Sequence, residues 1–264
     1  MFQEARDERF TARRPDNRQV GVFVFSSNSG STKWSVERDQ TQEDRRNTMT
    51  SYGNGLRAAL MGQSWRMLML VPGSLRRRLV RHVPRPLLYS LSWVLMLGMP
   101  DRVVLDRRII PALIDSGAKT VLSIGVAYYN AHHPAIFAAR GAELWTIDVD
   151  QQKAIWGSPG RHITGDALDL ARHLAPEAFD AVILNGVLGY GIDDTRSVDR
   201  ALRSIAAVLK PGGRLVIGWN HDKAQDPTSL PAAKELFRPC ALLDGAAHLV
   251  LEGSTMVYDF LERA

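Results

Sequence analysis

The stretch 121–150, VLSIGVAYYNAHHPAIFAARGAELWTIDVD, constrains the fold more than any other part of this chain. An apolar run at 121–124 is typical of a buried parallel strand, and Gly125 follows it where the chain must turn. Residues 132–140 have the spacing of a helix, and a second apolar run at 144–147 predicts another strand. Strand, turn, helix and strand in this order indicate the opening unit of an α/β sheet.

An acid stands at the end of the second predicted strand. Asp148 lies 23 residues after Gly125. In nucleotide-binding α/β folds, an acid about 20 residues past the glycine turn accepts hydrogen bonds from a ribose diol. We therefore predict that Asp148 binds a ribose. The alternative is that Asp148 caps the helix that follows it.

The rest of the chain repeats the alternation of strands and helices. Further strands are predicted at 161–164, 179–184, 214–219, 248–251 and 256–261. A helix is predicted at 197–209, where Lys-Pro-Gly-Gly stops it. The last two strands are joined by a short connector with glycine, which is typical of a hairpin. The predicted fold class is α/β, with a Rossmann-like, mostly parallel sheet that ends in an antiparallel hairpin.

Five segments occur in a specific order, namely VLSIG, ELWTIDVD, GDALDL, FDAVILNGVLGY and LKPGGRLVIGW. Together they resemble the class I S-adenosylmethionine-dependent methyltransferases over roughly residues 105–264. The most specific piece is the Leu-Lys-Pro-Gly-Gly at 209–213 before a strand, preceded by a Phe-Asp-apolar strand. The resemblance implies an S-adenosylmethionine cofactor and methyl transfer to a small-molecule or lipid-like acceptor.

The resemblance also implies roles for individual residues. Gly125 would be the glycine that the cofactor approaches closely. Asp166, with the backbone of Ala167, matches the position that reads the adenine edge, although Asp166 equally suits a turn. Asn185 and Gly186 match the strand end that faces the methyl group. The implied cofactor-binding residues are Gly125, Ala127, Tyr129, Asp148, Asp166, Ala167 and Asn185.

Three positions depart from the family pattern. Family members usually have an acid where this chain has Ser123, and glycines where it has Ala127 and Tyr129. Glycine lets a backbone approach a ligand and adopt positive φ, so Tyr129 must reroute the loop, stack on the ligand or fill the space of the methionine moiety. A second hypothesis follows, a non-catalytic protein of this fold that acts by binding a partner. A nicotinamide-dependent oxidoreductase is disfavoured because the G-x-G-x-x-G pattern is absent.

The sequence assigns no catalytic side chain firmly. Methyl transfer asks little of side chains, because the sulfonium is already activated and in-line positioning lowers much of the barrier. His221 is the best candidate for a general base, with a surface histidine as the alternative. Tyr190, Asp193 and Asp194 could line an acceptor pocket, or could form a polar loop with a helix cap.

No metal site is predicted. His132 and His133 begin a predicted helix without metal-ligand spacing to a third donor, so we expect solvent-facing or capping roles. Cys240 is the only cysteine, which excludes an intrachain disulfide and is compatible with a reducing compartment. The first residues lack an apolar signal core, so we expect a cytoplasmic location, with membrane association as an option.

Two segments precede the methyltransferase-like domain at 105–264. Residues 1–48 have mixed charge and many Ser, Asn and Gln, which predicts a largely disordered tail with a marginal hairpin around 28–30. Residues 49–104 are predicted to form a basic, apolar helical appendage, since 49–108 hold ten arginines and two acids.

The apolar run at 87–99 allows two interpretations of this appendage. As a helix it spans about 20 Å, too short for a bilayer core of about 30 Å. It could be a cap packed on the domain, with the run buried and the arginines solvated. Alternatively, residues 51–100 could contact a membrane of anionic lipid, which suits a lipid-linked acceptor. Nucleic acid is disfavoured because no binding module is recognisable. The oligomeric state does not follow from the sequence.

Overall fold

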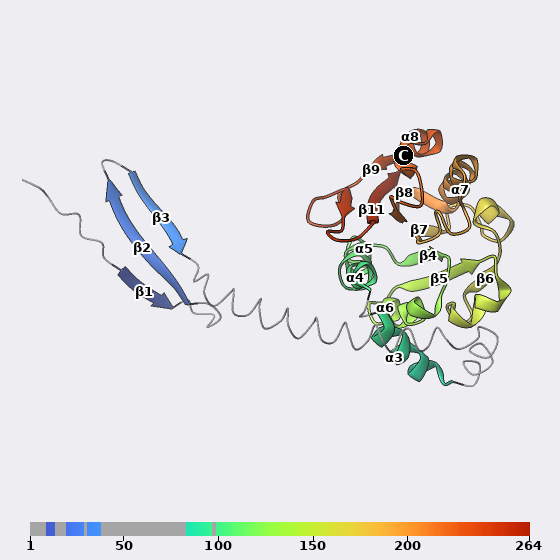
Figure 1. Cartoon of the computed structure of the whole chain (residues 1–264), viewed down its shortest axis with the longest axis horizontal. Coiled ribbons are helices and arrows are strands. Elements are labelled where there is room, and N and C mark those ends of the chain that lie inside the picture. Colours follow the sequence, from blue (N-terminus) through green and yellow to red (C-terminus); the bar gives the residue numbers. More distant parts are fainter. Residues whose placement is uncertain (1–8, 14–19, 29–30, 38–82, 97–98) are drawn as a thin grey trace, which may run out of the picture. The chain divides into compact units, whose positions relative to one another are not determined.

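The computed structural model of this chain describes residues 9–13, 20–28, 31–37, 83–96 and 99–264 (Figure 1). The chain divides into two units, Met1–Leu60 and Met61–Ala264, which are described separately.

The first unit contains a three-stranded antiparallel sheet. Its strands are β1 (Arg9–Arg13), β2 (Val20–Asn28) and β3 (Ser31–Glu37), in the order β1-β2-β3. The pairing of Asn28 with Ser31 lies where the sequence predicts a marginal hairpin. The sheet differs from the disorder predicted for most of this segment, and the valines and phenylalanines of β2 account for the difference because they favour strands.

An eight-stranded sheet forms the centre of the second unit. Its strands are β4 (Thr120–Ile124), β5 (Glu143–Asp148), β6 (His162–Thr164), β7 (Phe179–Asn185), β8 (Leu209–Asn220), β9 (Phe237–Pro239), β10 (His248–Val250) and β11 (Met256–Arg263). The order is β10-β11-β8-β7-β4-β5-β6, and β9 pairs with β11. Strands β4 to β8 are mutually parallel, while β11 is antiparallel to β8, β9 and β10. The predicted parallel sheet with an antiparallel end is confirmed, and β9 is an addition to it.

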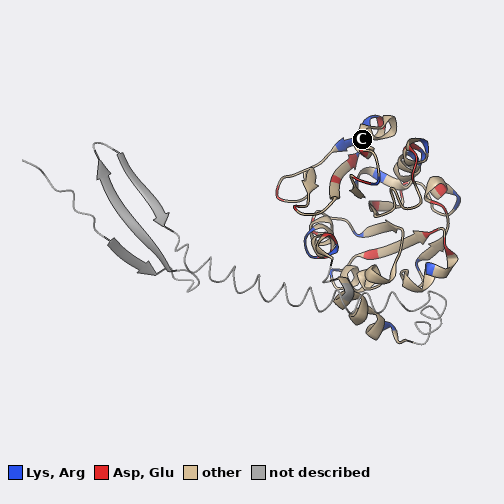
Figure 2. Ribbon diagram, in the orientation of Figure 1, with Lys and Arg blue, Asp and Glu red and all other residues tan. Residues whose placement is uncertain are grey.

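Helices cover both faces of this sheet (Figure 1). The helical elements that precede β5 in the chain are α3 (Arg85–Met96), α4 (Pro100–Val104), the π-helical turn η1 (Leu105–Ile109), α5 (Ile110–Asp115), the 3-10 turn η2 (Tyr128–Asn130) and α6 (His133–Ala138). The helical elements that follow β5 are η3 (Gln151–Trp156), η4 (Ala167–Arg172), α7 (Thr195–Val208), η5 (Pro227–Ser229) and α8 (Pro231–Leu236). Acidic and basic residues are interspersed over these elements (Figure 2).

The two largest clusters of the core lie on opposite faces of the sheet. Leu122 of β4 packs in a cluster with Leu202 and Ile205 of α7. Its neighbour Val121 packs on the opposite face, in a cluster with Ile109 and other residues of η1 and α5. A parallel sheet needs cover on both faces, and the stretch α4-η1-α5 supplies it on the second one. This helical stretch is continuous across residue 105, where the sequence predicts a domain boundary.

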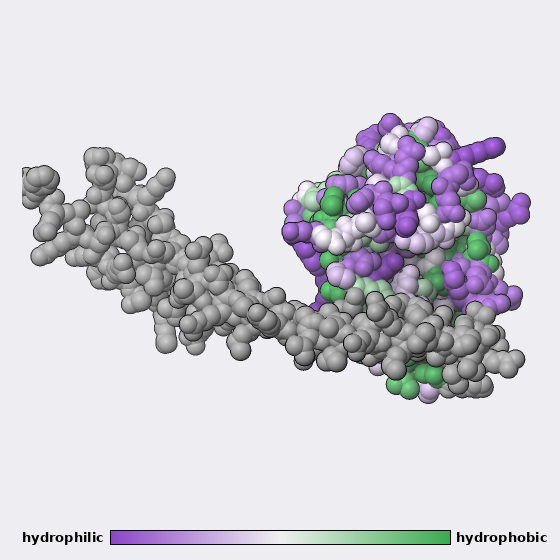
Figure 3. Space-filling view, in the orientation of Figure 1, coloured by the Kyte–Doolittle hydropathy of each residue, from purple (hydrophilic) through white to green (hydrophobic). Residues whose placement is uncertain are grey.

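Helix α3 is only half buried. Leu88, Ser92 and Met96 are buried and share one side of the helix at four-residue spacing. Leu87, Leu91 and Val94 are 60%, 43% and 44% exposed, so the expectation that the whole apolar run is buried is wrong for these three. Figure 3 shows hydrophobic surface at the lower edge of the unit, in the place where Figure 1 draws α3. None of the described helices combines the length and the hydrophobicity needed to cross a bilayer.

Candidate active site

A cavity of about 830 Å³ opens at the carboxyl ends of the parallel strands. In the sheet order, β4 lies between β5 and β7, so the chain runs outward from β4 through β5 to β6 and then crosses to the other side of β4 at β7. Open α/β sheets bind their ligands at this switch point. The ends of the five parallel strands each contribute to the wall of this strand-end cavity, through Gly125, Asp148, Gly165, Asn185 and Asn220.

The structure brings the predicted cofactor residues together. Gly125, Ala127, Tyr129, Asp148, Asp166, Ala167 and Asn185 all line the strand-end cavity, as do Gly186 and Tyr190. His221 is exposed and is not among the lining residues within the described part of the chain. Its backbone N–H donates to the carbonyl of Thr255 at 3.0 Å. The geometry therefore gives no support to His221 as the general base.

The two acids after Tyr190 have local roles. Asp194 is the N-cap of α7, since its carboxylate accepts from the Ser197 backbone N–H at 2.9 Å. Asp193 accepts from the backbone N–H of Gly191 at 2.9 Å. These contacts match the interpretation as a polar loop with a helix cap.

Gly125 is the one position of the loop after β4 that requires glycine. Its φ is +81°, in the left-handed region that other residues rarely adopt. A Cβ built there would lie 2.8 Å from Cγ2 of Val187. Because Gly125 has no side chain, its backbone stays accessible to a ligand in the cavity.

Gly125→Ala is expected to destabilise the fold by about 1–3 kcal/mol, because both the backbone angle and the contact with Val187 become unfavourable. Gly160→Ala is the matched control, since Gly160 has φ +71° but nothing within 4 Å of its Cβ position. Urea denaturation of both variants separates the two contributions. An equal loss in both would show that the contact with Val187 contributes nothing.

Tyr129 lies in a short helical turn a few residues after Gly125. Residues Tyr128–Asn130 form a 3-10 turn, and Tyr129 is not among the described residues other than glycine that have positive φ. Asn130 closes the turn, because its side-chain oxygen accepts from the Ala127 N–H at 2.8 Å. The turn therefore spares Tyr129 a positive φ, and its side chain lines the cavity.

Asp148 is a buried carboxylate with partly filled acceptor capacity. Its Oδ2 accepts from the Val126 N–H at 2.9 Å and lies 3.2 Å from Lys153 Nζ. Its Oδ1 accepts from the Asp150 N–H at 2.9 Å. A carboxylate offers about four acceptor sites, so one remains for a ligand, and a second opens if Lys153 turns away. The capping alternative is wrong, because Asp150 is the N-cap of η3.

Asp166 has the predicted turn role and also lines the cavity. It lines the cavity and is also the N-cap of η4, where its Oδ1 accepts from the Leu168 N–H at 2.9 Å. One of its oxygens is therefore used within the turn.

Asn185 presents a buried acceptor without a partner. Its Oδ1 makes no hydrogen bond with any described residue. A Cβ on Gly218 would lie 2.0 Å from this atom, so glycine there is needed to accommodate the amide. An unpaired buried acceptor costs about 1–3 kcal/mol, and a ligand that donates a hydrogen bond relieves that cost. The unpaired Oδ1, the buried Asp148 and the open backbone at Gly125 fit a ligand with a ribose and an amino group.

Arg102 of α4 is a cavity residue that the sequence interpretation missed. Only 9% of it is exposed, and its Nε lies 3.2 Å from Asp101 Oδ2. The guanidinium carbon stands 4.6 Å from the centre of the Tyr129 ring. Burial opposes its charge, but the neighbouring tyrosines and aspartates outweigh burial and raise the pKa of Arg102. The available signal was an arginine directly followed by three apolar residues, in the run DRVVL before the first parallel strand.

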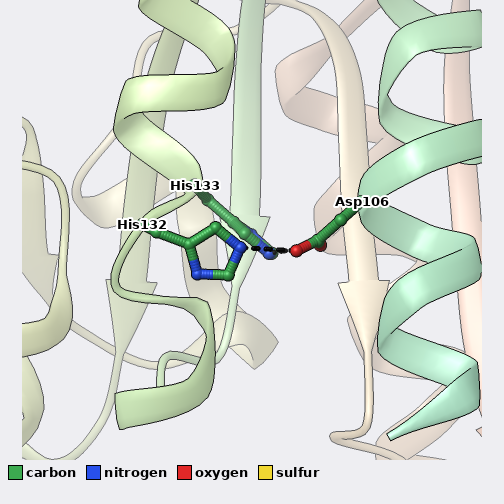
Figure 4. A group of neighbouring side chains, drawn as sticks. All are labelled: Asp106, His132 and His133. Atoms are coloured by element: carbon green, nitrogen blue, oxygen red, sulfur yellow. Dashed lines mark hydrogen bonds and ion pairs between the residues drawn. The ribbon is translucent and has the colours of Figure 1, made fainter. Parts of the chain in front are cut away.

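A second cluster lies outside the cavity lining. Asp106 of η1 is fully buried and accepts from Nε2 of His132 at 2.5 Å and from Nε2 of His133 at 2.8 Å (Figure 4). Nδ1 of His132 pairs with the Ser92 hydroxyl at 2.7 Å. Both histidines are buried and neither caps a helix through its side chain, so the expected solvent-facing or capping roles are wrong. The cluster ties η1, α6 and α3 together.

The cluster has the geometry of a hydrogen-bonded network. Its three possible ligand atoms lie within 4.8 Å of one another. Ligand atoms about 2.0–2.1 Å from a tetrahedral zinc ion stand about 3.3 Å apart, which is longer than both histidine contacts of Asp106. Burial alone would raise the pKa of Asp106, but the charges and hydrogen bonds of His133 and His132 lower it to about 2.

Part of this chain matches a known protein family. Residues 124–217 match the family described as "Methyltransferase domain". The chain is similar in structure to the N-methyltransferase NodS from Bradyrhizobium japonicum WM9, with 18% identity and a TM-score of 0.48 over 62% of this chain and 97% of that one. It is similar to the PH0226 protein from Pyrococcus horikoshii OT3, with 13% identity and a TM-score of 0.48 over 63% and 92%.

A search of curated proteins gave no match. The family match runs from Ile124 of β4 to Ile217 of β8, so it includes Gly125, Asp148, Gly165 and Asn185 of the cavity wall but not Asn220. Residues 124–217 are therefore similar to a methyltransferase domain.

Proposed function

We propose that this chain binds S-adenosylmethionine in the strand-end cavity and transfers its methyl group to a small-molecule acceptor. The observation that carries the proposal is the buried Asp148 beside the open backbone of Gly125, at the switch point of the sheet. Asp148 would hold the ribose, and Asp166 would lie at the adenine end. The side-chain oxygen of Asn185 would accept a hydrogen bond from the amino group of the cofactor's methionine part.

The chain's own part in the reaction is binding and orientation. When bound, S-adenosylmethionine supplies a methyl group that its sulfonium already activates for attack by the acceptor. Holding two reactants in line contributes much of the rate acceleration, so no side chain needs to change its protonation state. Tyr190, Asn220 and Met256 line the cavity and would contact the acceptor. An acceptor whose nucleophile is already free of its proton suits this site, because His221 does not line it.

Ligand-induced stabilisation tests the proposal against a non-catalytic protein of the same fold. At a ligand concentration 100 times the dissociation constant, binding stabilises the folded state by about 2.7 kcal/mol. Thermal unfolding with S-adenosylmethionine or S-adenosylhomocysteine should therefore show a clear rise in Tm. No shift with either ligand at millimolar concentration would favour the non-catalytic protein. Transfer of a labelled methyl group to fractionated small molecules would then identify the acceptor class.

A lipid-like acceptor at a membrane surface is a second candidate. The exposed Leu87, Leu91 and Val94 of α3 favour it, because an apolar helix side can insert at the surface of a bilayer. The full chain should sediment with vesicles that contain phosphatidylglycerol, and less so in the variant Leu87→Ser with Leu91→Ser. Absence of sedimentation at both low and high salt would exclude this candidate. Under this second candidate function, we propose that the chain lies in the cytoplasm at the surface of a membrane, and cell fractionation tests this location.

A further inference from the structure

Arg102 has more hydrogen-bond donors than its own contacts use. A guanidinium carries five N–H donors. Nη2 donates to the hydroxyl of Tyr129 at 3.4 Å, and Nε forms the ion pair with Asp101. Among the described residues the guanidinium has no other hydrogen-bond or ion-pair partner, so three donors, including both on Nη1, remain for a ligand. Arg102 lines the cavity, so a ligand can reach these donors.

The guanidinium is held in place from several sides. The ring of Tyr129 lies against it at 4.6 Å. The buried hydroxyl of Tyr258 donates to the carbonyl of Asp101 at 2.9 Å and so ties the start of α4 to β11. A Cβ on Gly186 would lie 2.8 Å from Nη2 of Arg102, so glycine there leaves room for the charge. A cation fixed in this way loses little freedom when it binds an anion.

Arg102 lies on the side of the cavity away from the proposed ribose site. Asp148 ends β5, on one side of β4, while Gly186 follows β7, on the other side. A cofactor whose ribose is bound by Asp148 extends past Gly125 toward β7. The amino-acid part of S-adenosylmethionine, which carries its only carboxylate, then lies on the side of Arg102.

We infer that Arg102 is the carboxylate-binding residue of this cavity and that Tyr129 positions it. A planar guanidinium binds a carboxylate through two parallel N–H donors. The carboxylate comes from the methionine part of the cofactor, in which case the inference rests on the proposed function, or from an acidic acceptor. The inference also gives Tyr129 a role, because the aromatic ring stands where the family pattern has glycine and stacks on the guanidinium.

Calorimetric titration of the full chain with two cofactors tests the inference. S-adenosylmethionine and decarboxylated S-adenosylmethionine differ only in the carboxylate. The wild-type chain should bind the carboxylated form about 10- to 100-fold more tightly, as expected for hydrogen bonds between charged groups. Arg102→Met should bind both forms alike, while Arg102→Lys should keep part of the preference. Arg107→Met is the matched control, because the exposed Arg107 stands over Trp93 in a similar ring contact and should leave binding unchanged.

A third probe identifies the source of the carboxylate. If the wild-type chain and Arg102→Met bind S-adenosylmethionine equally, benzoate is titrated into their complexes with S-adenosylhomocysteine. Benzoate binding that Arg102→Met loses assigns Arg102 to an acidic acceptor and supports the inference. If neither the cofactor preference nor benzoate binding depends on Arg102, the inference is wrong. A wild-type chain that binds neither cofactor overturns the proposed function, and benzoate binding to the free chain then tests Arg102 alone.

Discussion

Asp106→Ala should lower the free energy of unfolding by about 3–5 kcal/mol, the range for removing one partner of a buried charged pair. The carboxylate is fully buried and accepts one hydrogen bond from each of His132 and His133. Its removal leaves both Nε2 groups without that partner and opens a space between η1 and α6. Urea denaturation followed by circular dichroism at pH 7 measures the loss. Asp115→Ala is the control, because Asp115 is exposed at the end of α5 and its removal should cost less than about 0.5 kcal/mol.

The same carboxylate gives stability a defined dependence on pH. The pKa of Asp106 is about 2 in the folded chain, against an ordinary value of 3.8. A lowered folded pKa contributes stability above the unfolded pKa, here about 2–3 kcal/mol, which disappears as the pH falls through the folded value. The stability gap between the wild type and Asp106→Asn should therefore shrink as the pH falls from about pH 4 to pH 2. A gap of the same size at pH 2 and pH 7 would contradict the low pKa.

The parallel sheet was predictable because its signals are local. The apolar runs of β4, β5, β7 and β8 occur in sequence, and each is followed by glycine, an acid or an amide. Such patterns need no knowledge of distant contacts. Strand β9 spans three residues and pairs with β11 through backbone hydrogen bonds, so its sequence carries little strand signal.

The predicted cofactor residues lie together for the same reason. Gly125, Asp148 and Asn185 stand at or just after strand ends, and parallel strands bring their carboxyl ends to one edge. Arg102 and Asp106 were missed as site and core residues because they come from helical turns before the first parallel strand. Their partners lie 26 and 27 residues away in sequence, beyond the reach of helical periodicity.

The histidines illustrate the same limit. His132 and His133 begin a helix, where polar residues usually face solvent. Only the docking of η1 beside α6 places Asp106 against them. The informative signal was an acid within the apolar stretch VVLDRRII, since a buried acid needs donors close by.

Asp148→Ala is expected to weaken the binding of S-adenosylhomocysteine by about 100-fold or more, because hydrogen bonds to a charged group contribute about 1.5–3 kcal/mol each. The substitution removes the ribose acceptor and also frees the N–H of Val126, which the carboxylate holds. Calorimetric titration measures the dissociation constant. Asp150→Ala is the control, because Asp150 caps η3 two residues away, and its backbone N–H still reaches Asp148.

A smaller ligand separates the ribose end of the site from the amino-acid end. 5′-Methylthioadenosine keeps the ribose and the adenine but has no amino-acid part. If Asp148 binds the ribose, Asp148→Ala should also bind 5′-methylthioadenosine more weakly than the wild type does. Arg102→Met should bind it with wild-type affinity. If Asp148→Ala bound both ligands with wild-type affinity, the role of the Asp148 carboxylate would be only to stabilise the loop that follows Gly125. The opposite order of effects, with Arg102 needed for the small ligand and Asp148 not, would reverse the direction in which the cofactor lies across β4.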